Sequence, residues 1–238
     1  MTDPPCGYPD CPVADLTPER LRALASTVWP AGTPLRRGHK SAFPDSAALV
    51  PGVGDTRFAP LGDTDHVYVA TTSVAALLES ALHDATPPDP RIRTAQLGMW
   101  RESAVRLTQP ARLIDLRDEQ LDRLGIDRSE LVATSAIHYR CTRRWAAALR
   151  GRHIGGYPTT GAVWNSRQIE LHARAIAHRP AVQELLTTSS AEVAVIWADR
   201  GAPTSLEADP IGGLGPLSAG PGLDFTIDLG ATLQIPIL

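Results

Sequence analysis

The stretch from residue 57 to residue 84, RFAPLGDTDHVYVATTSVAALLESALHD, runs from a loop through a short strand into a helix. Alternation in HVYVAT puts Val67 and Val69 on one face of the strand and Tyr68 on the other. Threonine and serine at positions 72 and 73 are natural caps for the amphipathic helix that follows. A half-buried strand followed directly by an amphipathic helix predicts a sheet with helices packed on it.

The rest of the chain adds strands in an order that excludes several folds. Helices are predicted at residues 17–28, 118–126, 129–149 and 169–186, and strands at 66–71, 161–166 and 192–199 with one or two more between 93 and 116. Two alternating segments, DFTIDL and ATLQIPI, end the chain, and a Gly/Pro-rich loop spans 201–222. These elements do not form a regular parallel βαβ series, and no GxGxxG or Walker pattern follows a strand. We therefore predict an α+β fold with a mixed or antiparallel central sheet and flanking helices.

Charge and composition limit the partners of the protein. The net charge is −3, which gives no general electrostatic attraction to nucleic acid or to an anionic membrane. No apolar run approaches the roughly 18 residues of a membrane span, and the N-terminus lacks the features of a signal peptide. We predict a cytoplasmic protein that binds neither membrane nor nucleic acid directly, so that an anionic ligand must be met by local arginines.

Three cysteines, Cys6, Cys11 and Cys141, do not make a disulfide framework. Cys6 and Cys11 have the spacing of half a zinc site, but we find no second closely spaced Cys/His pair after them. The expectation is therefore that the chain holds no metal.

A second informative stretch is GAVWNSRQ, at residues 161–168. Trp164 and Ser166 share one face of a short strand, and Arg167 follows at its end. The sequence around Ser166 is not a nucleophile elbow, and no base is identified beside it, so a hydrogen-bonding serine is the better interpretation. Taken alone, the basic cluster LRRGHK at 35–40 is better interpreted as a solvated loop, and Glu79, off the apolar stripe of its helix, as a solvated carboxylate.

Together these residue types would suit one chemistry if Arg37, Arg57, Tyr68, Glu79 and Ser166 converge. Arginine forks bind the oxygens of a pyrophosphate bidentately. A tyrosine can stack on a heteroaromatic ring or orient a ribose. A glutamate near an anomeric carbon can stabilise an oxocarbenium-like transition state. Such a set would suit cleavage of the nicotinamide–ribose bond of NAD.

Five motifs in order resemble the RES-domain family of toxins from RES–Xre toxin–antitoxin pairs, over residues 34–200. LRRGH resembles the early L-x-R-x-H segment, RFAPL resembles R-F-x-P-L, and HVYVATTSVAALLESALHD resembles the segment that carries a tyrosine, a glutamate and a histidine. Tyr139, Thr142 and Trp145 fit Y-x-x-T-x-x-W-A, and GAVWNSRQ fits G-x-x-W-x-S-R. The resemblance implies one RES-like NAD-degrading domain at 34–238, preceded by a leader and helix at 1–33.

The resemblance also implies a fold similar to ADP-ribosyltransferases, hydrolysis or phosphorolysis of NAD, and an Xre-like antitoxin with which the chain assembles as an oligomer. NAD would be the substrate, with no further cofactor. Carried over by motif, Glu79, Arg57 and Ser166 are the catalytic candidates. The candidates for substrate binding are Arg37, Tyr68, Trp164 and Arg167. A slip of one residue would exchange Arg36 for Arg37.

Two alternatives stay open. ADP-ribosyl transfer to a macromolecule would use the same site with another acceptor. A catalytically inactive module would only bind a nucleotide or a partner.

Overall fold

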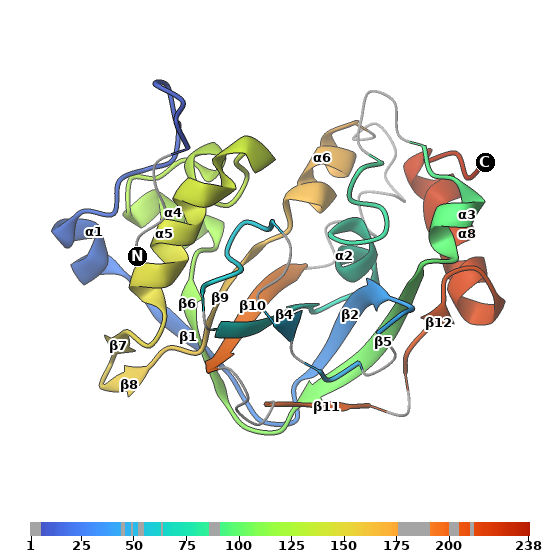
Figure 1. Ribbon diagram of the computed structural model, residues 1–238, viewed down its shortest axis with the longest axis horizontal. Helices are drawn as coiled ribbons and strands as arrows, with labels where there is room; N and C mark the ends of the chain where they lie inside the picture. Colours follow the sequence, from blue (N-terminus) through green and yellow to red (C-terminus); the bar gives the residue numbers. More distant parts are fainter. Residues whose placement is uncertain are drawn as a thin grey trace.

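The structure of the protein is a computed structural model, shown in Figure 1. It describes residues 6–43, 46–48, 50–51, 55–62, 64–85, 91–175, 191–199, 205–209 and 212–238. The strands of the main sheet are β1 (Ser26–Trp29), β2 (Pro34–Lys40), β3 (Val50–Pro51), β4 (Thr64–Ala70), β5 (Trp100–Leu107), β6 (Ala111–Asp115), β9 (Gly161–Asn165), β10 (Glu192–Asp199), β11 (Leu206–Ala208) and β12 (Gly215–Pro216). A separate hairpin pairs β7 (His153–Ile154) with β8 (Tyr157–Pro158).

The helices are α1 (Pro18–Ala23), α2 (Ser73–Leu78), α3 (Thr94–Leu97), α4 (Asp118–Arg123), α5 (Tyr139–Leu149), α6 (Arg167–Ala175) and α8 (Gly220–Leu233), with 3₁₀ turns at Arg128–Glu130 and Ala136–His138. In Figure 1, α5, α6, α2 and α8 follow one another along one side of the curled sheet. Among the described residues, no helix is both long and apolar enough to cross a membrane.

The sheet is mixed, and its strands follow the order β1-β6-β9-β10-β4-β2-β5-β11, with β3 beside β4 and β12 beside β5. Pairing is antiparallel throughout the described strands except between β6 and β9, which run parallel. The predicted α+β class, with a mixed sheet and flanking helices, is confirmed. β1, which lies within the expected leader, pairs with β6 and so belongs to the same sheet.

Both faces of the sheet are apolar, because each strand alternates its side chains between two cores. On one face, Val67 and Val69 of β4 join a cluster formed almost wholly by strand residues. On the other face, Ala70 joins the larger cluster, to which the helices contribute Leu77 of α2 and Trp145 of α5. The predicted alternation of β4 is therefore confirmed, and α2 packs where the sheet meets the larger core.

Three predicted helices are shorter in the structure. The helix expected at 17–28 is α1, followed by β1, and the helix expected at 129–149 begins only at Tyr139, after the two 3₁₀ turns. The helix of the opening stretch ends at Leu78, and the N–H of Leu82 donates to the carbonyl of Leu77 in a wider turn. Glu79 is thus the C-cap of α2, and its backbone leaves the helical region at φ −88° and ψ 3°.

Three segments have a different type from the predicted one. Of the expected pair of alternating segments at the C-terminus, residues 224–233 belong to the single helix α8, which ends at Leu233. Its buried residues Gly222, Thr226, Leu229 and Leu233 recur at helical spacing, so the prediction of strands was wrong. The expected basic loop at 35–40 is strand β2, which buries alternate side chains. Residues 93–97, expected to be strand, include α3.

Parts of other predictions lie outside the described residues. They concern residues 1–5 of the leader, residues 176–186 of the helix expected at 169–186, and residues 201–204 and 210–211 of the expected loop.

Gly38 in β2 allows α2 to pack directly on the sheet. A Cβ atom at this position would overlap the side chain of Ser80 and lie 2.9 Å from the carbonyl oxygen of Ala76. The backbone carbonyl cannot move away without displacing the helix. This close approach places the C-terminal end of α2, and with it Glu79, over β2 and β4.

We predict that Gly38→Ala lowers the free energy of unfolding by about 2 kcal/mol, the usual cost of forcing extra volume into a packed contact. Urea denaturation followed by circular dichroism measures the change. Gly98→Ala is the matched control, since its added Cβ meets nothing closer than the carbonyl of Ala95 at 3.5 Å. Equal stability of the two variants would contradict the role assigned to Gly38.

Candidate active site

A cavity of about 380 Å³ opens beside α2, which is within the size range of small-molecule sites, about 300–1,000 Å³. Its walls come from β2, β4, β9, β10, the loop before Phe58, the end of α2 and the start of α5. The polar and aromatic residues of the lining are Arg36, Asp55, Thr56, Arg57, Tyr68, Glu79, Ser80, His83, Asp84, Trp100, Tyr139 and Trp164. The cavity therefore gathers residues from positions 36 to 193 of the chain.

Glu79 is held at the cavity wall by donors from another part of the fold. The hydroxyl of Ser166 donates to Glu79 Oε1 over 2.6 Å, and the backbone N–H of Gln168 donates to the same oxygen over 3.3 Å. Among the described residues, no group donates to Oε2. The carboxylate thus has one oxygen fixed by the protein and one that can meet a ligand.

Ser166 has two partners because it begins α6. Its Oγ accepts from the N–H of Ile169 over 3.3 Å, which is the bond of a helix N-cap, while its hydroxyl proton is given to Glu79. The Glu79 carboxylate consequently lies at the N-terminus of α6, where an anion is favoured by the exposed N–H groups and the helix dipole. Ser166 is buried and does not line the cavity, so it positions Glu79.

Arg57 brings a buried positive charge to the same cavity. Its guanidinium lies 5.1 Å from the centre of the Tyr139 ring and donates to the carbonyl of Thr134 over 3.0 Å. Arg57 is only 7% exposed, its Nε has no hydrogen-bond partner, and no described carboxylate forms an ion pair with it. A buried arginine without a counter-ion is costly, so this geometry favours an anionic ligand.

The structure places Arg36 on the cavity and Arg37 away from it. Successive residues of β2 face opposite sides of the sheet, and Arg37 is buried on the far side, where it donates to the carbonyls of Ser46 and Ala48. Of the two arginines that a slip of one residue would exchange, Arg36 therefore lines the cavity and Arg37 does not. Arg36 lies 3.8 Å from the fully buried carboxylate of Glu102, which fixes its guanidinium at the wall.

Tyr68 and Trp164 form the aromatic part of the wall. The hydroxyl of Tyr68 is 2.9 Å from Thr56 Oγ1 and accepts from the N–H of Phe58 over 3.1 Å, so it fastens the loop that carries Arg57 to β4. Burial raises the pKa of Tyr68 to about 12, and the phenol is neutral at pH 7. Trp164 is buried, and its indole Nε1 has no partner among the described residues. The N–H groups of Trp164 Nε1 and Arg57 Nε are therefore both available to donate to a ligand.

Arg167 lies outside the cavity lining, although it shares an acceptor with Arg57. Its guanidinium donates to the carbonyl of Thr134 over 3.2 Å. The structure thus brings Arg57, Tyr68, Glu79 and Trp164 together on the cavity, with Ser166 and Arg167 adjoining these residues.

Sequence reasoning gave no role to Tyr139 and Thr142, which support Arg57. Tyr139 lies beneath the guanidinium, and the hydroxyl of Thr142, one turn later on α5, donates to the backbone carbonyl of Arg57. Positions i and i+3 share one face of a helix, so the spacing Y-x-x-T already indicated that both residues face one neighbour. Which neighbour this is depends on contacts across more than 80 positions of sequence, which a local pattern does not contain.

The cavity, lined by a carboxylate, a buried arginine and aromatic rings, has the size and lining of a site for a small molecule. The family model for the RES domain matches residues 27–198, most of the chain, and the protein belongs to the RES domain family. The fold is similar to that of a chain in the crystal structure of the M. tuberculosis MbcT–MbcA toxin–antitoxin complex, with a TM-score of 0.52 and 14% sequence identity. That similarity covers 90% of this chain and 96% of the other. Among curated proteins, none matches this chain in sequence.

Two buried histidines near Arg37, one in β2 and one in β4, give a prediction about pH. Burial, with the nearby charge of Arg37, lowers the pKa of His39 and of His66 to about 4. Their pKa in the unfolded chain is about 6.5. Between these values only the unfolded state binds the proton, so the free energy of unfolding falls as the pH is lowered from about 6.5 to about 4. Each histidine contributes a slope of up to about 1.4 kcal/mol per pH unit.

Urea denaturation at several pH values from 7 to 5 measures that slope. His66→Gln should reduce it, whatever the variant costs in absolute stability. His153→Gln, which changes an exposed histidine of β7, serves as the control. A slope that is the same in both variants would contradict the assignment.

Proposed function

We propose that the protein is a toxin enzyme that degrades NAD by cleaving the bond between nicotinamide and ribose. The observation that carries this proposal is the Glu79 carboxylate, which is fixed through one oxygen by Ser166 and faces the same cavity as Arg57, a buried cation with no carboxylate partner among the described residues. Membership of the RES domain family and the similarity to a chain of a toxin–antitoxin complex support it. The expected likeness to ADP-ribosyltransferases is part of the proposal.

The two arginines would bind the pyrophosphate of NAD. Arg57 supplies a buried charge with no described carboxylate partner, and Arg36 supplies a guanidinium oriented by Glu102. Planar guanidinium groups match phosphate oxygens bidentately, and a buried site strengthens this attraction. Tyr68 and Trp164 would pack against the nicotinamide riboside, to which the indole N–H offers a donor.

Glu79 would act at the scissile bond. As the bond from C1′ of the ribose to the nicotinamide nitrogen breaks, the electron pair leaves with nicotinamide and positive charge develops on the ribose. The free oxygen of Glu79 would stabilise that charge, while Ser166 and the N–H of Gln168 keep the carboxylate in place. Water or phosphate then adds at C1′. ADP-ribosyl transfer would use the same steps with a macromolecular acceptor.

An antitoxin is the proposed partner. We expect an Xre-like protein to cover the cavity and to assemble with this chain in the cytoplasm. Inhibition would follow from exclusion of NAD, since the cavity is the proposed substrate site.

We predict that Glu79→Gln slows NAD loss by at least about 100-fold, because the amide cannot stabilise developing positive charge. The glutamine oxygen can still accept from Ser166, so the variant should keep its fold. The measurement is the rate of NAD loss with purified protein, together with a thermal unfolding curve. Glu207→Gln is the control, since Glu207 is an exposed partner of Arg106 at the sheet edge.

Chromatography of the products, with and without phosphate, identifies the acceptor. Free ADP-ribose indicates hydrolysis and a phosphorylated product indicates phosphorolysis, whereas a mass increase on proteins or nucleic acid indicates transfer. Unchanged NAD in every reaction, or equal rates for wild type and Glu79→Gln, would refute the proposed function and leave a binding module.

A further inference from the structure

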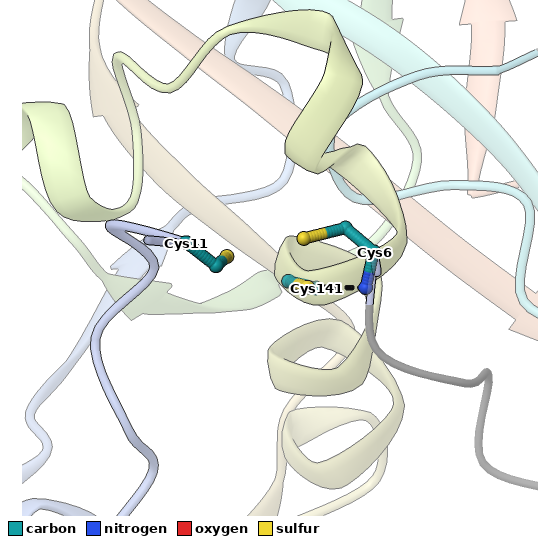
Figure 2. A group of neighbouring side chains, drawn as sticks. All are labelled: Cys6, Cys11 and Cys141. Atoms are coloured by element: carbon teal, nitrogen blue, oxygen red, sulfur yellow. Dashed lines mark hydrogen bonds between the residues drawn. The ribbon is translucent and has the colours of Figure 1, made fainter. Parts of the chain in front are cut away.

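The three cysteines of this chain converge at one place, away from the cavity lining. Figure 2 shows Cys6 and Cys11 on the N-terminal segment and Cys141 on α5, with their side chains gathered between the two segments. Their sulfur atoms all lie within 4.8 Å of one another. The backbone N–H of Cys6 also donates to the sulfur of Cys141 over 3.3 Å. Because 130 residues separate Cys141 from Cys11, the fold and not local sequence brings them together.

A histidine adjoins the three thiols. His138 Nδ1 lies 3.5 Å from the sulfur of Cys6, and the buried His138 ring makes a T-shaped contact with the ring of Tyr8. His138 and Cys141 form a closely spaced pair, H-x-x-C, which supplies the second half of a metal site that the sequence was expected to lack. With C-x-x-x-x-C at Cys6 and Cys11, the chain has both halves of a Cys₃His set.

Two simpler roles for the cluster fit less well. Free cysteines that serve as small core residues are usually fully buried, whereas Cys6 and Cys11 are partly exposed and all three are free thiols. A disulfide would use two sulfurs and leave the third and the histidine without a function. Three thiols and an imidazole instead match the ligand number, softness and geometry that zinc prefers.

We propose that Cys6, Cys11, Cys141 and His138 bind a structural zinc ion. Tetrahedral coordination at a zinc–sulfur distance of about 2.3 Å puts the sulfurs about 3.8 Å apart. Side-chain movements of about 1 Å from the present cluster reach this spacing. The N–H of Cys6 then stabilises the Cys141 thiolate, as hydrogen bonds to ligand atoms do in other metal sites.

Such an ion would fasten the N-terminal segment to the first turn of α5. That turn also carries Tyr139 and Thr142, which contact the side chain and the carbonyl of Arg57. Zinc therefore supports the wall of the cavity without touching a substrate. This role does not depend on the identity of the reaction.

Metal analysis of the purified full-length chain tests the proposal. Elemental analysis after exhaustive dialysis should find about one zinc per chain. Cys11→Ser and Cys141→Ser should lose the metal, and the chelated wild type should unfold several degrees lower. His153→Ala is the matched control for His138→Ala, since His153 is exposed on β7. Retention against a competing chelator should be weaker in His138→Ala, and equal retention would remove His138 from the ligand set.

Cobalt substitution of the wild type is independent of how the variants fold. Cobalt bound by thiolates in a tetrahedral site gives near-ultraviolet charge-transfer bands and intense visible bands. A cobalt spectrum without thiolate bands, wild-type protein without stoichiometric metal, or a disulfide found by thiol titration would overturn the proposal. Zinc retained in Cys141→Ser would do the same.

Discussion

The hydrogen bond from Ser166 to Glu79 joins the parts of the fold on which the candidate site depends. It links the end of α2 to the junction of β9 and α6, and it is made 87 positions apart in sequence. It can form only because Gly38 lets α2 lie against β2 and because Ser166 caps α6. Ser166 thus caps α6 and also fixes the carboxylate of Glu79. This second bond explains how Glu79, at the end of the short helix α2, is held in one position.

Electrostatics gives the second constraint. Glu79 has its negative charge at a helix N-terminus, whereas Arg57 has its positive charge in a buried setting with a carbonyl, an aromatic ring and no described carboxylate. The cavity therefore holds a fixed anion and an unbalanced cation at different points of its wall. A ligand with an anionic group and a centre that becomes positive during reaction satisfies both. The far side of the sheet shows the contrasting case, in which Arg37 is satisfied by backbone carbonyls beside the neutral His39.

Sequence patterns predicted those features that local chemistry decides. Alternation predicted β4, the strand expected at 192–199 is β10, the cap at residue 72 predicted the start of α2, and motif order indicated Glu79 and Arg57 as candidates. The misses have different causes. In α8 an alternating sequence is helical because its buried face follows the helical period, and β2 can bury Arg37 because carbonyls from 46 and 48 meet it. The Cys/His cluster was missed because its second pair was not recognised 130 residues further on.

The central claim is that the free oxygen of Glu79 faces the scissile bond of NAD while Arg57 and Arg36 hold the pyrophosphate. A crystal structure of the Glu79→Gln protein with NAD tests it most directly. The account predicts that residue 79 contacts the ribose beside the nicotinamide, that the nicotinamide riboside packs against Trp164 and Tyr68, and that phosphate oxygens lie on the two guanidinium groups. A dinucleotide bound elsewhere, or bound in the cavity with its adenine end at residue 79, would contradict it.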